Sequence, residues 1–331
     1  MDWDEPRLGR HLKLRDLSLL LTVARCGSMG KAAAALSVSQ PAISKAIADM
    51  EYALGVRLLE RKPQGVEPTN YGRVLLDRGL VAFDELRQAM KHIEFLADPT
   101  AGEVRIGCSV VLSEGFVAAV VDRLSRRYPR IEFHLLVGES GTTYRALKAR
   151  EVDLAIARLF GATAEEHLNV EPLYDEWYVV AAGPRNPWTR RRGIRLADLM
   201  EEPWVLPPLD GLTGAVVIEA FRASGLDVPA ATVVTSSTPT RRALLATGRF
   251  LTIIPASVLR LAAENPAPRA LPIELPRTPR PIGIVTLKAR TLTPVAQRFI
   301  DGAREVAKSL PATSRRRDPP AKAGSGRDRD H

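Results

Sequence analysis

The 331-residue sequence contains little of what most metalloproteins, disulfide-bonded proteins and membrane proteins need. Its two cysteines, Cys26 and Cys108, are isolated and lie in apolar segments, as reduced core residues do. The five histidines are scattered without an i, i+4 pair or a nearby cluster of carboxylates, so we expect no metal ion and no other cofactor. No run of about 18 apolar residues is present, and the N-terminus is too charged for a secretory signal, which favours a cytoplasmic location.

The net charge of +9 is not concentrated where a nucleic-acid-binding segment is expected. Residues 1–98 contain 14 Lys and Arg against 13 Asp and Glu, and most of the excess positive charge lies after them. Bulk charge strengthens non-specific attraction to polyanions. It therefore cannot assign a DNA-binding function by itself, and local motifs must do so.

Helix-breaking residues and the spacing of apolar residues divide the chain into four parts. We expect a winged helix-turn-helix at 12–68, a linker helix at 69–97 and a strand–helix alternation at 102–310. The Pro- and Gly-containing segment 98–102 separates the last two. Residues 311–331 lack apolar periodicity and are predicted to be a disordered, basic tail.

The N-terminal part has the pattern of three short helices. The first covers roughly Leu14 to Ala24; Ser28 is a good N-cap for the second, and Ser39 for a third that begins with Gln40 and Pro41. Apolar residues at helical spacing should face the core and leave a polar face for DNA. The predicted DNA-contacting residues of this part are Ser28, Lys31, Ser39, Gln40, Pro41, Ala42, Ser44 and Lys45.

A two-stranded wing is expected after these helices, from Val56 to Arg61 and from Gly65 to Pro68. Arg61 and Lys62 at its tip are predicted to reach the DNA phosphates. Helical periodicity alone is equally consistent with a small helical domain whose polar face is only solvated.

Residues 27–72 resemble the N-terminal signature of LysR-type transcriptional regulators. The matching landmarks are Ala32, Ala33, Leu36, Ser39, Gln40, Pro41, Ser44, Glu51, Leu54, Gly55, Leu58, Arg61, Thr69 and Gly72. Lys45 stands where that family more often has Arg, which keeps the charge but loses the planar fork that pairs with guanine. Residues 11–17 and 94–108 are most similar to the branch of galactose-binding-protein regulators.

The linker helix has a short coiled-coil pattern that predicts a dimer. Leu76, Phe83 and Met90 repeat every seven residues, and Leu86 and Ile93 occupy the alternate seam positions. The family resemblance implies the same dimer, which would present two recognition helices to successive major-groove turns. A helix that packs only on its own domain is the alternative.

Strands and helices alternate from Glu103 to about Lys308, which predicts a mainly parallel α/β sheet. The loop Ser109–Ser113 is part of this prediction, and the chain is expected to return through Leu271–Leu275 and Ile282–Leu287 to a closing helix at Pro294–Lys308. The resemblance implies a two-lobed, periplasmic-binding-protein-like (type 2) effector domain with lobe 1 at 102–170 and 268–310 and lobe 2 at 171–267. Its cleft would place effector contacts on Ser109, Val110, Glu139, Ser140, Arg158, Pro207, Leu209, Thr235 and Ser236.

Three functions stay open at this point. The first is a cytoplasmic LysR-type regulator, a homotetramer that binds promoter DNA and RNA polymerase and responds to a sugar, sugar acid or aromatic acid. The second is an enzyme on the same fold with Cys108 as nucleophile, although no partner base is recognisable. The third is a DNA-binding protein without an effector.

Overall fold

The computed structural model describes residues 12–63, 65–159, 166–261, 268–275 and 280–310. The predicted tail 311–331 lies outside the described residues. The chain divides into two compact units. The first contains the N-terminal part to Gly102 with the short segments Lys148–Glu151 and Arg290–Pro294, and the second contains the rest.

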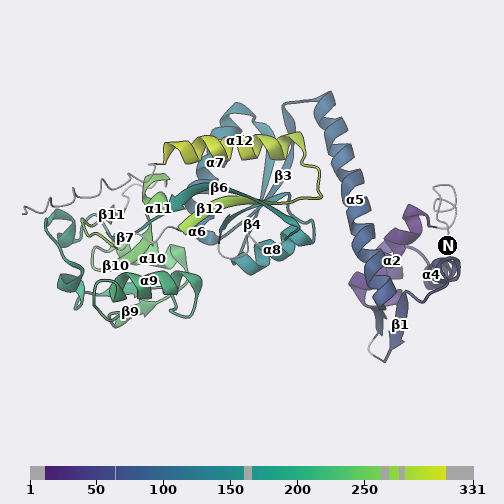
Figure 1. The fold of residues 1–331 in the computed structure, drawn as a ribbon, viewed down its shortest axis with the longest axis horizontal. Helices are drawn as coiled ribbons and strands as arrows, with labels where there is room; N and C mark the ends of the chain where they lie inside the picture. The colour runs from purple at the N-terminus through teal and green to yellow at the C-terminus, as the bar shows by residue number, and fades with distance from the viewer. Residues whose placement is uncertain (1–11, 64, 160–165, 262–267, 276–279, 311–331) are drawn as a thin grey trace, which may run out of the picture. The chain divides into compact units, whose positions relative to one another are not determined.

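Among the described residues, three helices form the N-terminal half of the first unit (Figure 1): α2 (Leu14–Cys26), α3 (Met29–Leu36) and α4 (Gln40–Leu54). Their predicted caps are present, since the Ser28 hydroxyl accepts from the Lys31 amide and the Ser39 hydroxyl from the Ala42 amide. These bonds satisfy amides that have no partner within the helix. The helices bury one apolar core, which contains Leu20, Val23, Ala32, Ile43, Ile47 and Met50.

The wing consists of β1 (Leu59–Lys62) paired antiparallel with β2 (Gly65–Pro68). β1 begins three residues later than predicted, because the Glu51 carboxylate accepts the amides of Leu58 and Leu59 at 2.7 and 3.2 Å. The Val66 amide donates to the Gly27 carbonyl at 2.8 Å. The wing is therefore fastened at both strands to the helices that precede it.

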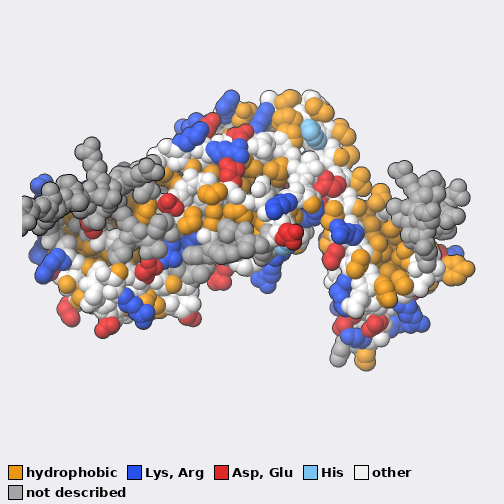
Figure 2. Space-filling model, in the orientation of Figure 1, with side chains coloured by type: hydrophobic (Ala, Val, Ile, Leu, Met, Phe, Trp, Pro, Cys, Tyr) orange, Lys and Arg blue, Asp and Glu red, His pale blue; other side chains and the backbone are white. Residues whose placement is uncertain are grey.

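Helix α5 (Asn70–Ala97) is 28 residues long, as the sequence predicted, with Thr69 as its N-cap. Leu76 does not belong to an exposed seam, because its side chain is buried in the core of the three helices. Phe83 is half-buried, whereas Leu86, Met90 and Ile93 are exposed. Figure 2 shows hydrophobic side chains gathered over the C-terminal half of α5.

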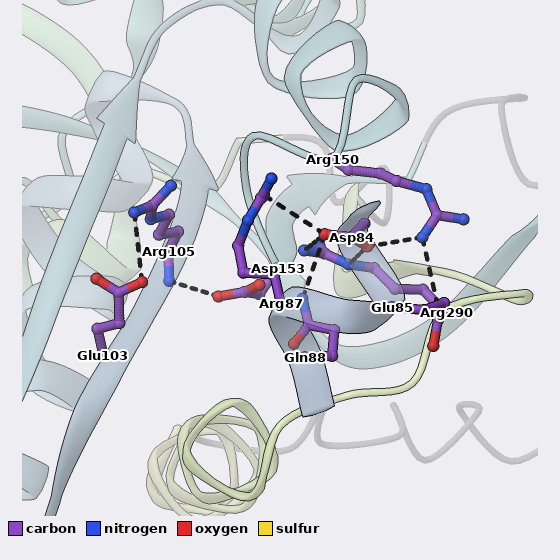
Figure 3. Close-up of polar contacts among 9 residues, drawn as sticks. All are labelled: Asp84, Glu85, Arg87, Gln88, Glu103, Arg105, Arg150, Asp153 and Arg290. Atoms are coloured by element: carbon purple, nitrogen blue, oxygen red, sulfur yellow. Dashed lines mark hydrogen bonds and ion pairs between the residues drawn. The ribbon is translucent and has the colours of Figure 1, made fainter. Parts of the chain in front are cut away.

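A buried carboxylate in α5 holds the two short segments of the first unit against the helix (Figure 3). Asp84 is 1% exposed and accepts hydrogen bonds from Arg150 at 2.7 Å and from Arg290 at 2.8 and 2.9 Å. Arg150 has a positive φ of 58°, which turns the chain sharply after helix α8 (Ser140–Lys148). Two guanidinium groups that come from distant parts of the sequence thus converge on a single carboxylate.

The described residues of the second unit form two five-stranded sheets. The first sheet has the order β4-β3-β5-β12-β6 and is covered by α7 and α12 on one side and by α8 on the other (Figure 1). Phe133 of β4 contacts Phe299 of α12, with ring centres 6.4 Å apart. The strands of this first sheet and the helices and turns beside it are β3 (Ala101–Cys108), α6 (Val110–Leu112), the π-helical turn η1 (Ser113–Val117), α7 (Ala118–Arg127), β4 (Arg130–Val137), α8 (Ser140–Lys148), β5 (Leu154–Arg158), β6 (Leu168–Glu176), β12 (Arg280–Leu287) and α12 (Pro294–Ser309).

The second sheet has the order β11-β7-β10-β8-β9. Strand β8 shows why both faces are covered: Trp204 and Leu206 pack with residues of α9, and Val205, which points to the opposite face, packs with Leu245 of α10. The strands of this second sheet and the helices and turns beside it are β7 (Tyr178–Ala182), the 3-10 turns η3 (Pro187–Arg190) and η4 (Leu196–Leu199), β8 (Trp204–Leu206), α9 (Leu212–Arg222), β9 (Ala231–Val234), α10 (Thr238–Ala246), β10 (Leu251–Pro255), α11 (Ala256–Leu261) and β11 (Arg269–Ala270).

Two details of the predicted α/β part are wrong. The sheets are mixed rather than mainly parallel, because β12 pairs antiparallel with β5 and β6, and β10 with β7. The predicted loop Ser109–Ser113 is helical, since the Ser109 hydroxyl caps α6 at the Leu112 amide. In the expected return of the chain, Ile282–Leu287 lies in β12, whereas Leu271–Leu275 follows β11 without regular secondary structure.

Candidate DNA-binding and effector-binding sites

The predicted recognition helix α4 has one buried and one exposed side. Ile43, Ile47 and Met50 are at most 3% exposed. The opposite side presents exposed Gln40 and Lys45, with Ser44 half-buried between them. A polar face of this kind on a helix fixed by its apolar side is the arrangement that reads base edges in the major groove.

The remaining predicted DNA contacts of the helices differ in how free they are to reach DNA. Lys31, Pro41 and Ala42 are exposed. The hydroxyls of Ser28 and Ser39 cap α3 and α4, so they position the helices. A β-carbon at Gly30 would lie 3.5 Å from Oε1 of Gln40, so the absence of a side chain at Gly30 leaves room for this amide.

The wing tip carries two exposed cations, Arg61 and Lys62. Lys62 forms an ion pair with Glu67 across the wing, and the hydrogen bond to this carboxylate raises the pKa of Lys62. Part of its charge is therefore already compensated within the wing. Arg61, opposite Val66 in the strand register, is the better placed of the two to attract phosphate.

The predicted effector contacts lie just after strands of the two sheets, but they differ in exposure. Ser109 follows β3 and is half-buried, whereas Val110 and Glu139 are exposed. Ser140 starts α8, and its side chain lies outside what is described. Arg158, the last residue of β5, is half-buried.

In the second sheet, Pro207 after β8 is buried, and Leu209 and Ser236 are exposed. Thr235 is half-buried, and its hydroxyl accepts the Ser237 amide at 3.0 Å. This bond belongs to a local turn that leads into α10. Of the predicted effector contacts, Arg158 is part of a polar cluster with Tyr178.

The polar cluster is built where the chain passes from β6 to β7. Arg158 donates a hydrogen bond to the Tyr178 hydroxyl, and its guanidinium carbon lies 5.6 Å from the centre of that ring. Glu176 is 3% exposed and accepts hydrogen bonds from the hydroxyl and the amide of Ser257. Burial raises the pKa of Glu176, and the bonds from Ser257 oppose this rise only in part.

Elements of both sheets meet at this cluster. The turn η1 packs against α11, and a β-carbon at Gly115 would lie 3.4 Å from the Cα of Val258. Phe116 packs against Tyr174 with ring centres 5.0 Å apart and a tilt of 37° between the rings, and burial raises the pKa of Tyr174. Bound molecules in two-lobed α/β proteins sit at junctions of this type, which makes it the candidate effector site.

Sequence reasoning missed most of this junction. Glu114, Tyr174, Glu176, Tyr178 and Arg241 were not predicted, because the expected contacts were placed on loops after strands. The signal available was the density of polar and aromatic residues at 174–178, which stand in an otherwise apolar strand pattern.

Features of other protein classes are scarce in the described part of the chain. No group of three His, Cys, Asp or Glu residues there is arranged to hold a metal ion. Among the described helices, none combines the length and apolar content needed to cross a membrane. Cys108 is buried, and burial raises the pKa of its thiol to about 11, which opposes a nucleophilic role.

Comparison with known families resolves the class of protein. Residues 14–73 match the bacterial regulatory helix-turn-helix proteins of the lysR family, and residues 97–308 match the LysR substrate binding domain. The chain belongs to the LysR family of transcriptional regulators. It is a DNA-binding transcriptional regulator with an effector-binding domain, and the predicted fold class is confirmed.

Curated relatives carry the same description. The HTH-type transcriptional regulator GbpR of Azospirillum brasilense is 28% identical over 291 residues, which cover 88% of this chain and 85% of GbpR. The regulator PcaQ of Agrobacterium fabrum is 30% identical over 285 residues, 85% of this chain and 90% of PcaQ. The likeness to GbpR agrees with the branch predicted from the sequence.

Solved structures share the fold. A full-length OxyR variant from Pseudomonas aeruginosa aligns with a TM-score of 0.62 at 22% identity, covering 90% of this chain and 97% of OxyR. Full-length CbnR in complex with its target DNA aligns with a TM-score of 0.51 at 23% identity, covering 89% of this chain and all of CbnR.

Proposed function

We propose that this LysR-family regulator recognises a promoter through the exposed face of α4 and that a small molecule bound near the β6–β7 crossing controls this recognition. The observation that carries the proposal is the division of α4 into a buried side with Ile43, Ile47 and Met50 and an exposed side with Gln40 and Lys45. Gln can pair with adenine, and Lys with guanine or phosphate, in the major groove.

The test is footprinting of the promoter regions that flank the gene, with the wild-type protein and with the double variant Gln40→Ala/Ser44→Ala. We expect a site with twofold symmetry that the double variant no longer protects, since a good base contact contributes about 1–3 kcal/mol. Tyr52→Ala at the other end of α4, where the side chain is 91% exposed, is the matched control and should protect normally. Equal protection of any DNA by all three proteins would reject sequence-specific recognition by α4.

We further propose that α5 mediates a dimer through Leu86, Met90 and Ile93, with half-buried Phe83 at the margin. Their exposure on a helix of 28 residues supports this, because such an apolar face is usually covered by a partner helix. Two dimers would form the tetramer. Ile93→Asp should then lower the mass measured by analytical ultracentrifugation, whereas Asp77→Asn, exposed on the same helix, should leave it unchanged.

The division expected from the sequence, at 12–68, 69–97 and 102–310, is part of the same proposal. In it, ligand binding favours one arrangement of the effector domain and thereby changes how paired DNA-binding domains engage the promoter. RNA polymerase is the further partner, and the cytoplasm, where promoter DNA lies, is the location. A ligand with equal affinity for both arrangements would have no effect.

An enzyme on this fold is the second candidate, and the buried Cys108 thiol with its raised pKa counts against it. A DNA-binding protein without an effector is the third. The polar cluster around Glu176 and Tyr178 counts against that candidate. Burying polar and ionisable side chains costs folding free energy, which is harder to explain if these side chains bind no ligand.

A further inference from the structure

Arg241 on α10 is a buried cation whose hydrogen bonds are incomplete. Its side chain is 4% exposed, and its Nε has no hydrogen-bond partner among the described residues. Burial lowers the pKa of Arg241, while the Glu114 carboxylate and, to a smaller extent, the Tyr178 hydroxyl act in the opposite direction. A buried guanidinium with an unused donor destabilises a fold, so its presence calls for a role other than packing.

The groups around Arg241 come from both sheets of the second unit. Glu114 lies on η1 beside the first sheet, and Tyr178 lies on β7 of the second. Tyr178 also accepts a hydrogen bond from Arg158 at the end of β5. Arg158 therefore contacts Tyr178 directly, and Tyr178 also acts electrostatically on Arg241, at the junction where we place the effector.

Carboxylate and phosphate groups complement guanidinium groups better than neutral hydroxyls do. They accept several charge-assisted hydrogen bonds at once, and these are about twice as strong as neutral ones. A neutral sugar would add no negative charge to that of Glu114 and could offer the unused Nε of Arg241 only a neutral acceptor.

We propose that Arg241 anchors a negatively charged effector and that the site selects small carboxylates or phosphates over neutral sugars. The inference rests on the proposed function, because it names the chemical class of the effector that controls DNA binding. Arg158 assists from the first sheet.

The experiment measures thermal unfolding of the full chain with sodium malonate or sodium phosphate, against sodium chloride of equal ionic strength and against neutral glycerol. We expect one of the two anions to raise the Tm, and the responding anion distinguishes a carboxylate site from a phosphate site. Arg241→Gln should raise the anion concentration for half-maximal protection about tenfold or more. Arg242→Gln, the exposed neighbour on the same helix, is the control and should respond as the wild type does.

Two results overturn the proposal in this assay: protection by neither anion beyond that of chloride, or equal protection of Arg241→Gln and the wild type. A second variant separates ligand binding from a structural ion pair. Arg241→Met without ligand should unfold at the same temperature or higher, because a destabilising buried charge is replaced by an apolar side chain of similar length. A fall of several degrees rejects the proposal. Promoter footprinting of the same variants measures DNA binding independently of anion binding. Normal footprints without anion protection would therefore reject this inference and leave the DNA-binding function intact.

Discussion

Removing the charge of Asp84 is the most direct test of how α5 is held. Asp84→Asn keeps the size of the side chain and one acceptor oxygen, but it leaves Arg150 and Arg290 without their shared counter-charge. The three side chains are 1%, 9% and 3% exposed, so solvent screens this loss very little. Breaking a buried pair by removing one partner costs about 3–5 kcal/mol. Because Asn still accepts one hydrogen bond, we expect about 3 kcal/mol.

Hydrogen exchange followed by mass spectrometry can locate this loss. We expect faster exchange in the middle of α5 and in the segments Lys148–Glu151 and Arg290–Pro294, which belong to the same compact unit. In a Trp3→Phe background, the fluorescence of Trp177, Trp188 and Trp204, all in the second unit, gives a separate measure of unfolding there. Asp77→Asn, exposed on the same helix, is the control.

The effect should depend on pH in a defined direction. Burial by itself would raise the pKa of Asp84, but the hydrogen bonds from Arg150 and Arg290 outweigh it, so the pKa lies below the ordinary value of 3.8. A group with a lowered pKa stabilises the folded state above its unfolded pKa, and this contribution is lost as the pH falls through the folded pKa. The difference between wild type and Asp84→Asn should be constant from pH 8 to about pH 5 and shrink below about pH 4.

Equal urea midpoints for wild type and Asp84→Asn at pH 7 would refute this reasoning. So would an equal loss in Asp77→Asn. Either result would mean that the two arginines find other partners at little cost once the carboxylate is removed.

Three further outcomes follow from particular contacts. Gly72→Ala should destabilise the winged helix by about 1–3 kcal/mol, because the added carbon would lie 2.0 Å from the Leu58 carbonyl oxygen; Gly141→Ala, with no atom within 4 Å, is the control in thermal unfolding. Glu51→Ala should cost about 1–3 kcal/mol by leaving two wing amides without their acceptor, measured by urea unfolding. Cys108 should react with iodoacetamide at pH 8 far more slowly in the folded than in the unfolded chain, and fast labelling of the folded protein would reopen the nucleophile hypothesis.

The helical part of the fold was predictable because its signals are local. Ser28, Ser39 and Thr69 cap helices at the predicted positions, since a cap involves only the next three residues. The burial of Leu76, which removes it from the predicted dimer seam, could not be predicted in the same way. The heptad pattern shows which side of the helix is apolar, but only packing shows that the preceding helices already cover this residue.

The α/β part was predictable in type and less so in detail. Buried strands such as Trp204–Leu206 are recognisable from their composition, yet pairing direction depends on where distant strands enter the sheet. β12, which is antiparallel to β5 and β6, begins over a hundred residues after β5 begins. The alternation of strands and helices along the sequence does not show that a late strand pairs with strands formed much earlier in the chain.

The sequence by itself determined the family, the helix-turn-helix and the apolar faces, because these follow from the spacing of neighbouring residues. Tertiary structure alone decided which charges become buried. Arg150 and Arg290 reach Asp84 from positions 66 and 206 residues away, and Glu176 meets Ser257 across 81 residues. The energy of such groups depends on the partners and the solvent around them, and both are set only when the distant segments of the chain have packed together.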